Sequence, residues 1–247
     1  DWTEIFAPLV VPDGSAGCDD IHSCAHKLVA IPAVLMMEQN MTIMTQHSDR
    51  NTTVNNDVLK GRNSNGTPPT ATPTETFLTW WFEFIERHID NSTGEVCPPA
   101  AHAKVVDCLG AGMAFHSLYT AAHRPWPLVS SVLDFALSLQ DPETHLWTST
   151  ISNWLNLDGV YQSTRSSAAL QSRRHHDVEV ACDSFLGAAA ETLNNVTKMT
   201  EWDSPFVVQS HALPGVLTAV AECGRVFPHL VQTERVWRVS TDKGPYP

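Results

Sequence analysis

The sequence predicts an all-α protein built from antiparallel helical hairpins. From residue 76 onward, apolar residues recur every three or four positions, which is typical of helices that bury one face. The chain has no segment with the alternation of apolar and polar residues that indicates a strand. A short pattern also occurs twice, starting at Asp90 and at Asp141, which are 51 residues apart. A repeat of this length is typical of stacked helical hairpins.

The N-terminal part, residues 1–44, is expected to be an irregular segment followed by one helix packed on the body. Proline and glycine residues interrupt any helical period over Asp1–Ser15. Helical periodicity then covers 21–39, where Pro32 should break or kink the helix. The chain starts at Asp1 without an initiator Met, so we expect a mature form from which a signal peptide has been removed.

Residues 45–75 are expected to be a glycosylated loop or linker. This stretch is rich in Asn, Thr, Ser, Gly and Pro, and its apolar content is too low to offset the entropy of ordering. It separates the N-terminal part from a helical-hairpin domain over 76–247.

Six helices are expected in the helical domain. Thr74 or Thr76 could cap the first helix, and Pro98 and Pro99 suit the first turn of the second. Gly159 could interrupt the fourth helix. The expected helices are the segment from the Thr cap to the Asp90 turn, 100–122, 128–139, 151–171, 178–194 and 210–226.

Cysteines and glycosylation sequons indicate an extracellular protein of the eukaryotic secretory pathway. An even number of cysteines, six, is typical of disulfides in an oxidising compartment, and the five sequons all use Thr. Nearest-neighbour pairing is our expectation for the disulfides, namely Cys18 with Cys24, Cys97 with Cys108, and Cys182 with Cys223. The expected glycosylated residues are Asn40, Asn51, Asn65, Asn91 and Asn195.

Charge and hydropathy exclude two classes of partner. The 15 basic and 27 acidic residues give a formal net charge of −12, which repels nucleic acid. The longest apolar stretch, Leu28 to Met37, is about half of the roughly 20 residues that span a bilayer. We therefore expect neither a nucleic-acid partner nor a membrane span.

The repeated motif resembles the helix-to-helix turns of α/α-toroid proteins. These turns follow the pattern Asp-x-x-Thr-Gly-x-Trp or a close variant, as in Asp90–Val96 and Asp141–Trp147. The resemblance covers about 77–226, and the family includes (α/α)-barrel glycoside hydrolases, polysaccharide lyases and toroids of unassigned activity. It implies an α/α toroid, here incomplete because only six or seven helices are expected, with a central cavity lined by the helix after each turn.

Two groups of residues on the expected inner helices are candidates for catalysis. His116 and Tyr119 share one helix face, and Asp158, Tyr161 and Arg165 share another. Asp158 could act as the acid or base of glycoside hydrolysis, assisted by Tyr161 and His116, with Arg165 orienting the substrate. In a lyase, a His/Tyr pair could instead serve as the base and acid of β-elimination from a uronic acid, with Arg165 neutralising the substrate carboxylate. The alternative interpretation is that these side chains only pack.

No metal or cofactor site is expected. Asp20, His22, Cys24 and His26 alternate in a way that converges poorly on zinc, and the oxidising compartment favours disulfides. The basic run 173–177 precedes a helix and is expected to form a solvated loop or a contact with a partner.

Two functions remain open from the sequence. The first is a secreted glycoprotein that binds or processes carbohydrate in a toroid cavity, as a glycoside hydrolase or polysaccharide lyase if it is an enzyme. The second is an extracellular structural subunit whose open helical array associates with other copies of itself into a filament or coat, without catalysis.

Overall fold

The computed structural model describes residues 2–4, 6, 24–38, 72–97, 105–171, 174–195 and 211–231. Within these residues the fold is helical, and the only β interaction is an isolated antiparallel bridge between Ile89 and Val96. The prediction of an all-α protein is confirmed for this part of the chain. Besides the helical segment 24–38, the helices are α3 (Pro73–Glu86), α4 (Val105–Ala121), α5 (Val129–Ser138), α6 (Leu155–Ala169), α7 (His175–Leu193) and α10 (Ala212–Val226).

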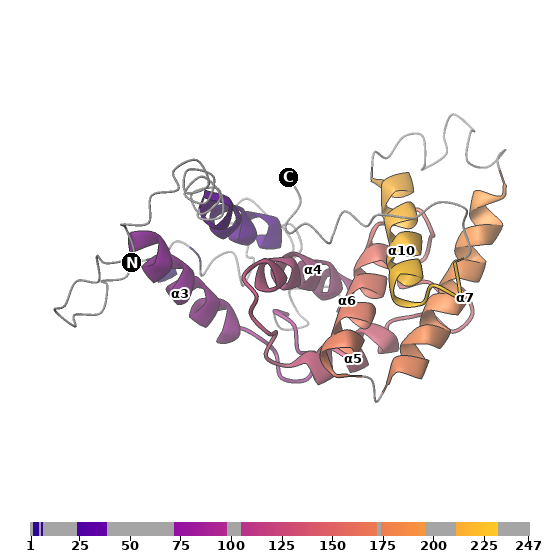
Figure 1. Cartoon of the computed structure of the whole chain (residues 1–247), viewed down its shortest axis with the longest axis horizontal. Coiled ribbons are helices and arrows are strands. Elements are labelled where there is room, and N and C mark those ends of the chain that lie inside the picture. Colours follow the sequence, from indigo (N-terminus) through magenta and orange to yellow (C-terminus); the bar gives the residue numbers. More distant parts are fainter. Residues whose placement is uncertain are drawn as a thin grey trace, which may run out of the picture.

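Helix α6 is the centre of the described fold. It packs against α4, α5, α7 and α10, and it lies between α4 on one side and α10 and α7 on the other (Figure 1). Nearly every residue of α6 is buried, polar ones included. The polar groups of α6 therefore have to be satisfied by neighbouring helices rather than by solvent.

The two copies of the repeated motif form the same turn. The Oδ1 atom of Asp90 accepts the amide hydrogens of the second and third residues after it at 2.8 and 3.0 Å, and that of Asp141 does so at 2.9 and 2.7 Å. The fourth residue, Gly94 or His145, has a positive φ of 73° or 61°. Its amide donates to the aspartate carbonyl at 2.8 Å in both turns. The 51-residue repeat is therefore a repeat of structure.

Helix α3 begins earlier than expected. Its N-cap is Thr72, whose Oγ1 accepts the Glu75 amide at 3.2 Å, while a Glu75 carboxylate oxygen accepts the Thr72 amide at 2.7 Å. Pro73 occupies the first turn, where the missing amide hydrogen costs nothing. The prediction of a cap at Thr74 or Thr76 was wrong because this capping box with Pro73 is the stronger start signal.

Two expected helix breaks do not occur. Residues 24–38 are helical throughout although Pro32, where a break or a kink was expected, lies among them, and α6 continues through Gly159. A Cβ at Gly159 would overlap the indole ring of Trp147, so this glycine permits close packing instead of breaking the helix. Tertiary packing therefore outweighs the low helix propensity of glycine at this position.

Helix α7 begins at His175, so the prediction that 173–177 forms a loop was wrong for its last three residues. Arg174 precedes the helix, and its Nε atom lies 2.7 Å from Asp177 Oδ2. Arg174 also forms an ion pair with Asp134 of α5. These acidic partners compensate for a cation at a helix N-terminus.

One disulfide is complete within the described residues. Cys97 and Cys108 are bonded with a Cα–Cα distance of 5.1 Å, which confirms that predicted pair and ties the first repeat turn to α4. Cys24 is also disulfide-bonded, whereas Cys18 lies outside the described residues. Cys182 and Cys223 are buried free thiols, so the predicted Cys182–Cys223 disulfide is not present in the structure.

Several expectations fall partly or wholly outside the described residues. Among the glycosylation sites, Asn91 is exposed in the first repeat turn and Asn195 is half-buried, while Asn40, Asn51 and Asn65 lie outside. The linker 45–75 lies outside except for its last four residues, and Asp20 and His22 of the alternating group Asp20, His22, Cys24 and His26 lie outside as well. No helix among the described residues is long and apolar enough to cross a membrane.

Candidate functional site

The unusual feature of the described core is a group of buried polar atoms without hydrogen-bond partners. Seven such side-chain atoms occur among the described residues, and all belong to α4, α6 or the turn before α4. Buried polar groups are normally hydrogen-bonded, so this concentration calls for an explanation. We call the residues that carry these atoms the α4/α6 polar set: Glu95, His116, Asp158, Gln162, Ser163 and Ser167.

Other buried polar groups in the same core have partners. Asn156 is 1% exposed, and its Oδ1 accepts the Trp147 amide at 2.9 Å while its Nδ2 donates to the Thr150 and Asn153 carbonyls at 2.9 Å. The fully buried Glu222 accepts five hydrogen bonds. The missing partners are therefore a local property of the α4/α6 polar set and not of the whole core.

The repeat places part of the polar set on one equivalent face of α4 and α6. His116 and Ser167 are 51 residues apart and so occupy equivalent positions, as do Gly112 and Ser163. In the toroid resemblance, the helix after each turn lines the centre of the ring. Five of the seven unpartnered atoms thus lie on the helices that the sequence expects to be inner, and the other two belong to Glu95 of the first repeat turn.

Glu95, His116 and Gln162 converge on Gly112. The His116 Nε2 atom lies 3.3 Å from Glu95 Oε1, and a Cβ at Gly112 would overlap both Glu95 Oε2 and Gln162 Nε2. The Gln162 amide donates to the Leu109 carbonyl, which leaves its Oε1 without a partner. Glycine is the only residue that leaves room for this arrangement.

Glu95 was missed by the sequence analysis. The first repeat turn delivers it directly into the core, where it is 0% exposed, whereas the second turn has Leu146 at the equivalent position. The turn itself therefore does not require a carboxylate. Burial raises the pKa of Glu95, and the nearby His116 opposes this shift. A comparison of the two turns, position by position, could have singled out Glu95.

Asp158 is the most strongly perturbed carboxyl group. It lies in the first turn of α6, is 1% exposed, and its Oδ2 has no hydrogen-bond partner. Burial raises its pKa well above the ordinary value of 3.8. Gln162 lies one helical turn further along the same face. Burial therefore favours the protonated, neutral form of the Asp158 carboxyl group.

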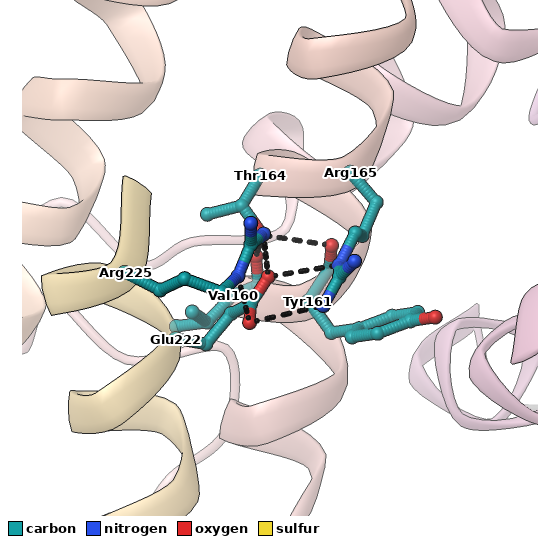
Figure 2. Close-up of polar contacts among 6 residues, drawn as sticks. All are labelled: Val160, Tyr161, Thr164, Arg165, Glu222 and Arg225. Atoms are coloured by element: carbon teal, nitrogen blue, oxygen red, sulfur yellow. Dashed lines mark hydrogen bonds and ion pairs between the residues drawn. The ribbon is translucent and has the colours of Figure 1, made fainter. Parts of the chain in front are cut away.

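Arg165 is held by Glu222 of α10. Its Nε donates to Glu222 Oε1 at 3.0 Å, and its Nη2 donates to Oε2 at 3.3 Å (Figure 2). Arg225 binds the same carboxylate, and Thr164 Oγ1 donates to it at 3.0 Å. Arg165 also lies 5.2 Å from the centroid of the Tyr161 ring, which points away from Glu222 in Figure 2. Glu222 could have been found from the sequence, because it is the one acidic residue in a largely apolar helix and lies three residues before Arg225.

The structure separates Tyr119 from the candidate residues of α6. The Tyr119 hydroxyl donates towards the Phe82 carbonyl at 3.4 Å and Glu86 Oε1 at 3.3 Å, so it faces α3. Burial, more than the neighbouring Glu86, raises its pKa. His116 and Tyr119 both contact the Trp126 ring, with distances between ring centroids of 4.2 Å for His116 and 4.6 Å for Tyr119.

No protein-family model, curated protein or solved structure matches this chain. No group of three or more potential metal-ligating side chains occurs within the described ranges.

Proposed function

We propose that the chain is a secreted protein that binds carbohydrate at the α4/α6 polar set and processes it by hydrolysis. The observation that carries this proposal is the confinement of the unpartnered buried polar atoms of the described residues to Glu95 of the first repeat turn and to the two helices that follow the repeat turns. Unsatisfied polar groups cost stability, and proteins retain them where a ligand uses them. Sugar hydroxyls are donors and acceptors that would supply the missing partners.

The two carboxyl groups of the polar set have different surroundings. Asp158 has no counter-charge, whereas Glu95 lies 3.3 Å from the His116 ring nitrogen. Pairs of carboxyl groups with unlike environments divide into a proton donor and an ionised partner in glycoside hydrolysis. In this proposal Asp158 is the general acid, and Glu95 with His116 supplies the base.

The arrangement favours hydrolysis over elimination. A lyase would need a cation to neutralise the uronate carboxylate, and Arg165 already shares the buried Glu222 with Arg225. The net charge of −12 also repels polyuronates. Neutral oligosaccharides are therefore the substrates to examine first.

The test is a screen of neutral oligosaccharides for binding and for release of reducing ends. Asp158→Asn should lower any turnover by at least about 100-fold, because it cannot donate a proton. Asp107→Asn is the matched control, since Asp107 is the half-buried repeat equivalent of Asp158 and should leave turnover unchanged. Equal activity of wild type and Asp158→Asn, or no glycan binding at all, would contradict the proposal.

One observation supports the structural subunit as a second candidate. The helical segment 24–38 exposes three apolar side chains, Ile31, Val34 and Met37, by 50%, 63% and 41%. If copies associate through them, Val34→Asp should abolish large assemblies in light scattering and electron microscopy. Val180→Asp is the control, because Val180 on α7 is 50% exposed but lies on a different helix. A monomer at every concentration would rule this candidate out.

A further inference from the structure

Two histidines converge on one carboxylate of α7. His229, which follows α10, has its Nε2 atom 2.6 Å from Glu179 Oε1, and His176 Nδ1 lies 3.6 Å from Glu179 Oε2. The contact with His229 joins residues 50 apart in sequence, so it ties the chain after α10 to α7. The side chains of Glu179 and His229 are 31% and 61% exposed, so protons from solvent reach both.

The segment 227–231 is attached to α7 at two points. Phe227 is the C-cap of α10 and is buried, and its ring centroid lies 4.7 Å from that of His175 in the first turn of α7. The second point is the contact between His229 and Glu179. Between the two, the Leu230 amide donates to the Phe227 carbonyl at 3.0 Å, so the segment forms a turn.

The strength of the second attachment depends on protons. An imidazole becomes charged as the pH falls below about 6.5, and a charged N–H binds a carboxylate more strongly than a neutral one. The hydrogen bond with His229 is the main cause that lowers the pKa of Glu179 from its ordinary value of 4.5. Stability from the ionised carboxylate is therefore present above 4.5 and is lost only as the pH falls through the lowered folded-state pKa. The attraction is greatest at mildly acidic pH, where the carboxylate and the imidazoles are all charged.

The charged groups of the helices packed against α7 bind each other. Arg165 of α6 and Arg225 of α10 both bind Glu222. On α7 itself, the exposed Asp183 lies one helical turn beyond Glu179, and its negative charge also attracts a protonated histidine. These groups leave the sign of the pH effect unchanged.

Protonation has an opposing effect at the start of α7. His175 and His176 lie in the first turn of this helix, where a positive charge opposes the helix dipole. Asp177 lies in the same turn and pairs with Arg174. The first turn of α7 and the segment 227–231 therefore have to be measured separately.

We propose that His229 and Glu179 form a proton-dependent latch, which fastens the segment 227–231 to α7 at mildly acidic pH and loosens it above neutrality. The contact of α6 with α10 through Glu222 involves no histidine, so the helices stay packed when the latch opens. The latch is independent of the proposed carbohydrate activity.

Hydrogen exchange of the full chain at about pH 6 and about pH 8 tests the latch. After correction for the intrinsic pH dependence of exchange, the amides of residues 229–231 should be protected at least about twofold more at the lower pH. Helix α5, which contains no histidine, is the internal reference and should show no such difference. Equal corrected protection of 229–231 at both pH values would overturn the proposal, and so would an equal gain in α5.

Three variants assign the effect to this pair. His229→Gln keeps a polar side chain that cannot become charged, and Glu179→Gln removes the carboxylate, so each should abolish the pH difference. His176→Gln is the matched control and should retain most of it, because His176 is 84% exposed and lies farther from Glu179. Persistence of the difference in His229→Gln or Glu179→Gln would overturn the proposal, as would its loss in His176→Gln alone. The comparison of the two pH values uses the unaltered chain and does not depend on how the variants fold.

Discussion

Replacing Glu222 by glutamine should destabilise the fold strongly although the side chain keeps its size. The carboxylate is 0% exposed, joins α10 to α6 through Arg165 and Thr164, and also binds Arg225 of its own helix. The two guanidinium groups donate four hydrogen bonds to it, at 2.6 to 3.3 Å. Glutamine retains one acceptor oxygen, and its amide hydrogens would face the guanidinium donors.

The size of the effect follows from the charge left behind. Removing one partner of a buried ion pair costs about 3 to 5 kcal/mol. The Arg165 and Arg225 side chains are 23% and 32% exposed, so water compensates in part and the loss should lie near the lower bound. For a chain of this length, about 3 kcal/mol corresponds to a fall of roughly 6 to 12 °C in Tm.

Urea and thermal unfolding, followed by circular dichroism, would measure this change. Glu179→Gln is the control, because Glu179 is a more exposed acid on α7 that pairs with His229 at 2.6 Å. Solvent screens this pair, so its loss should lower stability much less than Glu222→Gln does. Adding Arg165→Met to Glu222→Gln should recover part of the loss by removing one orphaned cation. A Glu222→Gln cost as small as that of Glu179→Gln would refute the reasoning.

Three further predictions concern the glycine contact, the repeat turn and the buried aspartate. Gly112→Ala should cost about 1 to 3 kcal/mol in urea unfolding, because its Cβ would overlap two side chains of the polar set. Gly187→Ala, which meets nothing within 4 Å, should instead stabilise α7 by up to about 1 kcal/mol. Asp141→Ala should lower the midpoint of urea unfolding, since Oδ1 accepts three hydrogen bonds there. Asp158→Asn should make stability depend less on pH. Because the pKa of Asp158 is raised in the folded state, the stability that its protonated form contributes is fully present below its ordinary pKa of 3.8. That stability is lost as the pH rises through the folded-state pKa.

Each of these has an outcome that would contradict it. Equal effects of the Gly112 and Gly187 substitutions would mean that the Gly112 contact is not tight. A loss in Glu143→Ala as large as in Asp141→Ala would contradict the turn argument, because only the backbone amide of Glu143 takes part in the turn. Unchanged pH dependence of unfolding in Asp158→Asn would show that Asp158 is not held neutral in the fold.

The candidate site was only half visible in the sequence. Helical spacing was sufficient to select Asp158 and His116, because residues three or four apart share a face. It also selected Tyr119 and Arg165, which the fold directs to Glu86 and Glu222. Helical spacing shows which face a residue occupies, but it does not show which other helix lies against that face. Glu95 and Gln162 were missed for the same reason, since their partners are far away in the sequence.

The sequence by itself determined the helical class, the repeat turns and the Cys97–Cys108 pair, because each rests on contacts between residues close in the chain. The amide hydrogen bonds to Asp90 and Asp141 are complete within four residues, so their pattern can be read locally. Tertiary structure decided that Gly159 admits the Trp147 ring, that Glu222 binds α6, and that Glu95 is buried beside His116. These outcomes depend on which helices meet, and that is set by the packing of the whole core rather than by any local pattern.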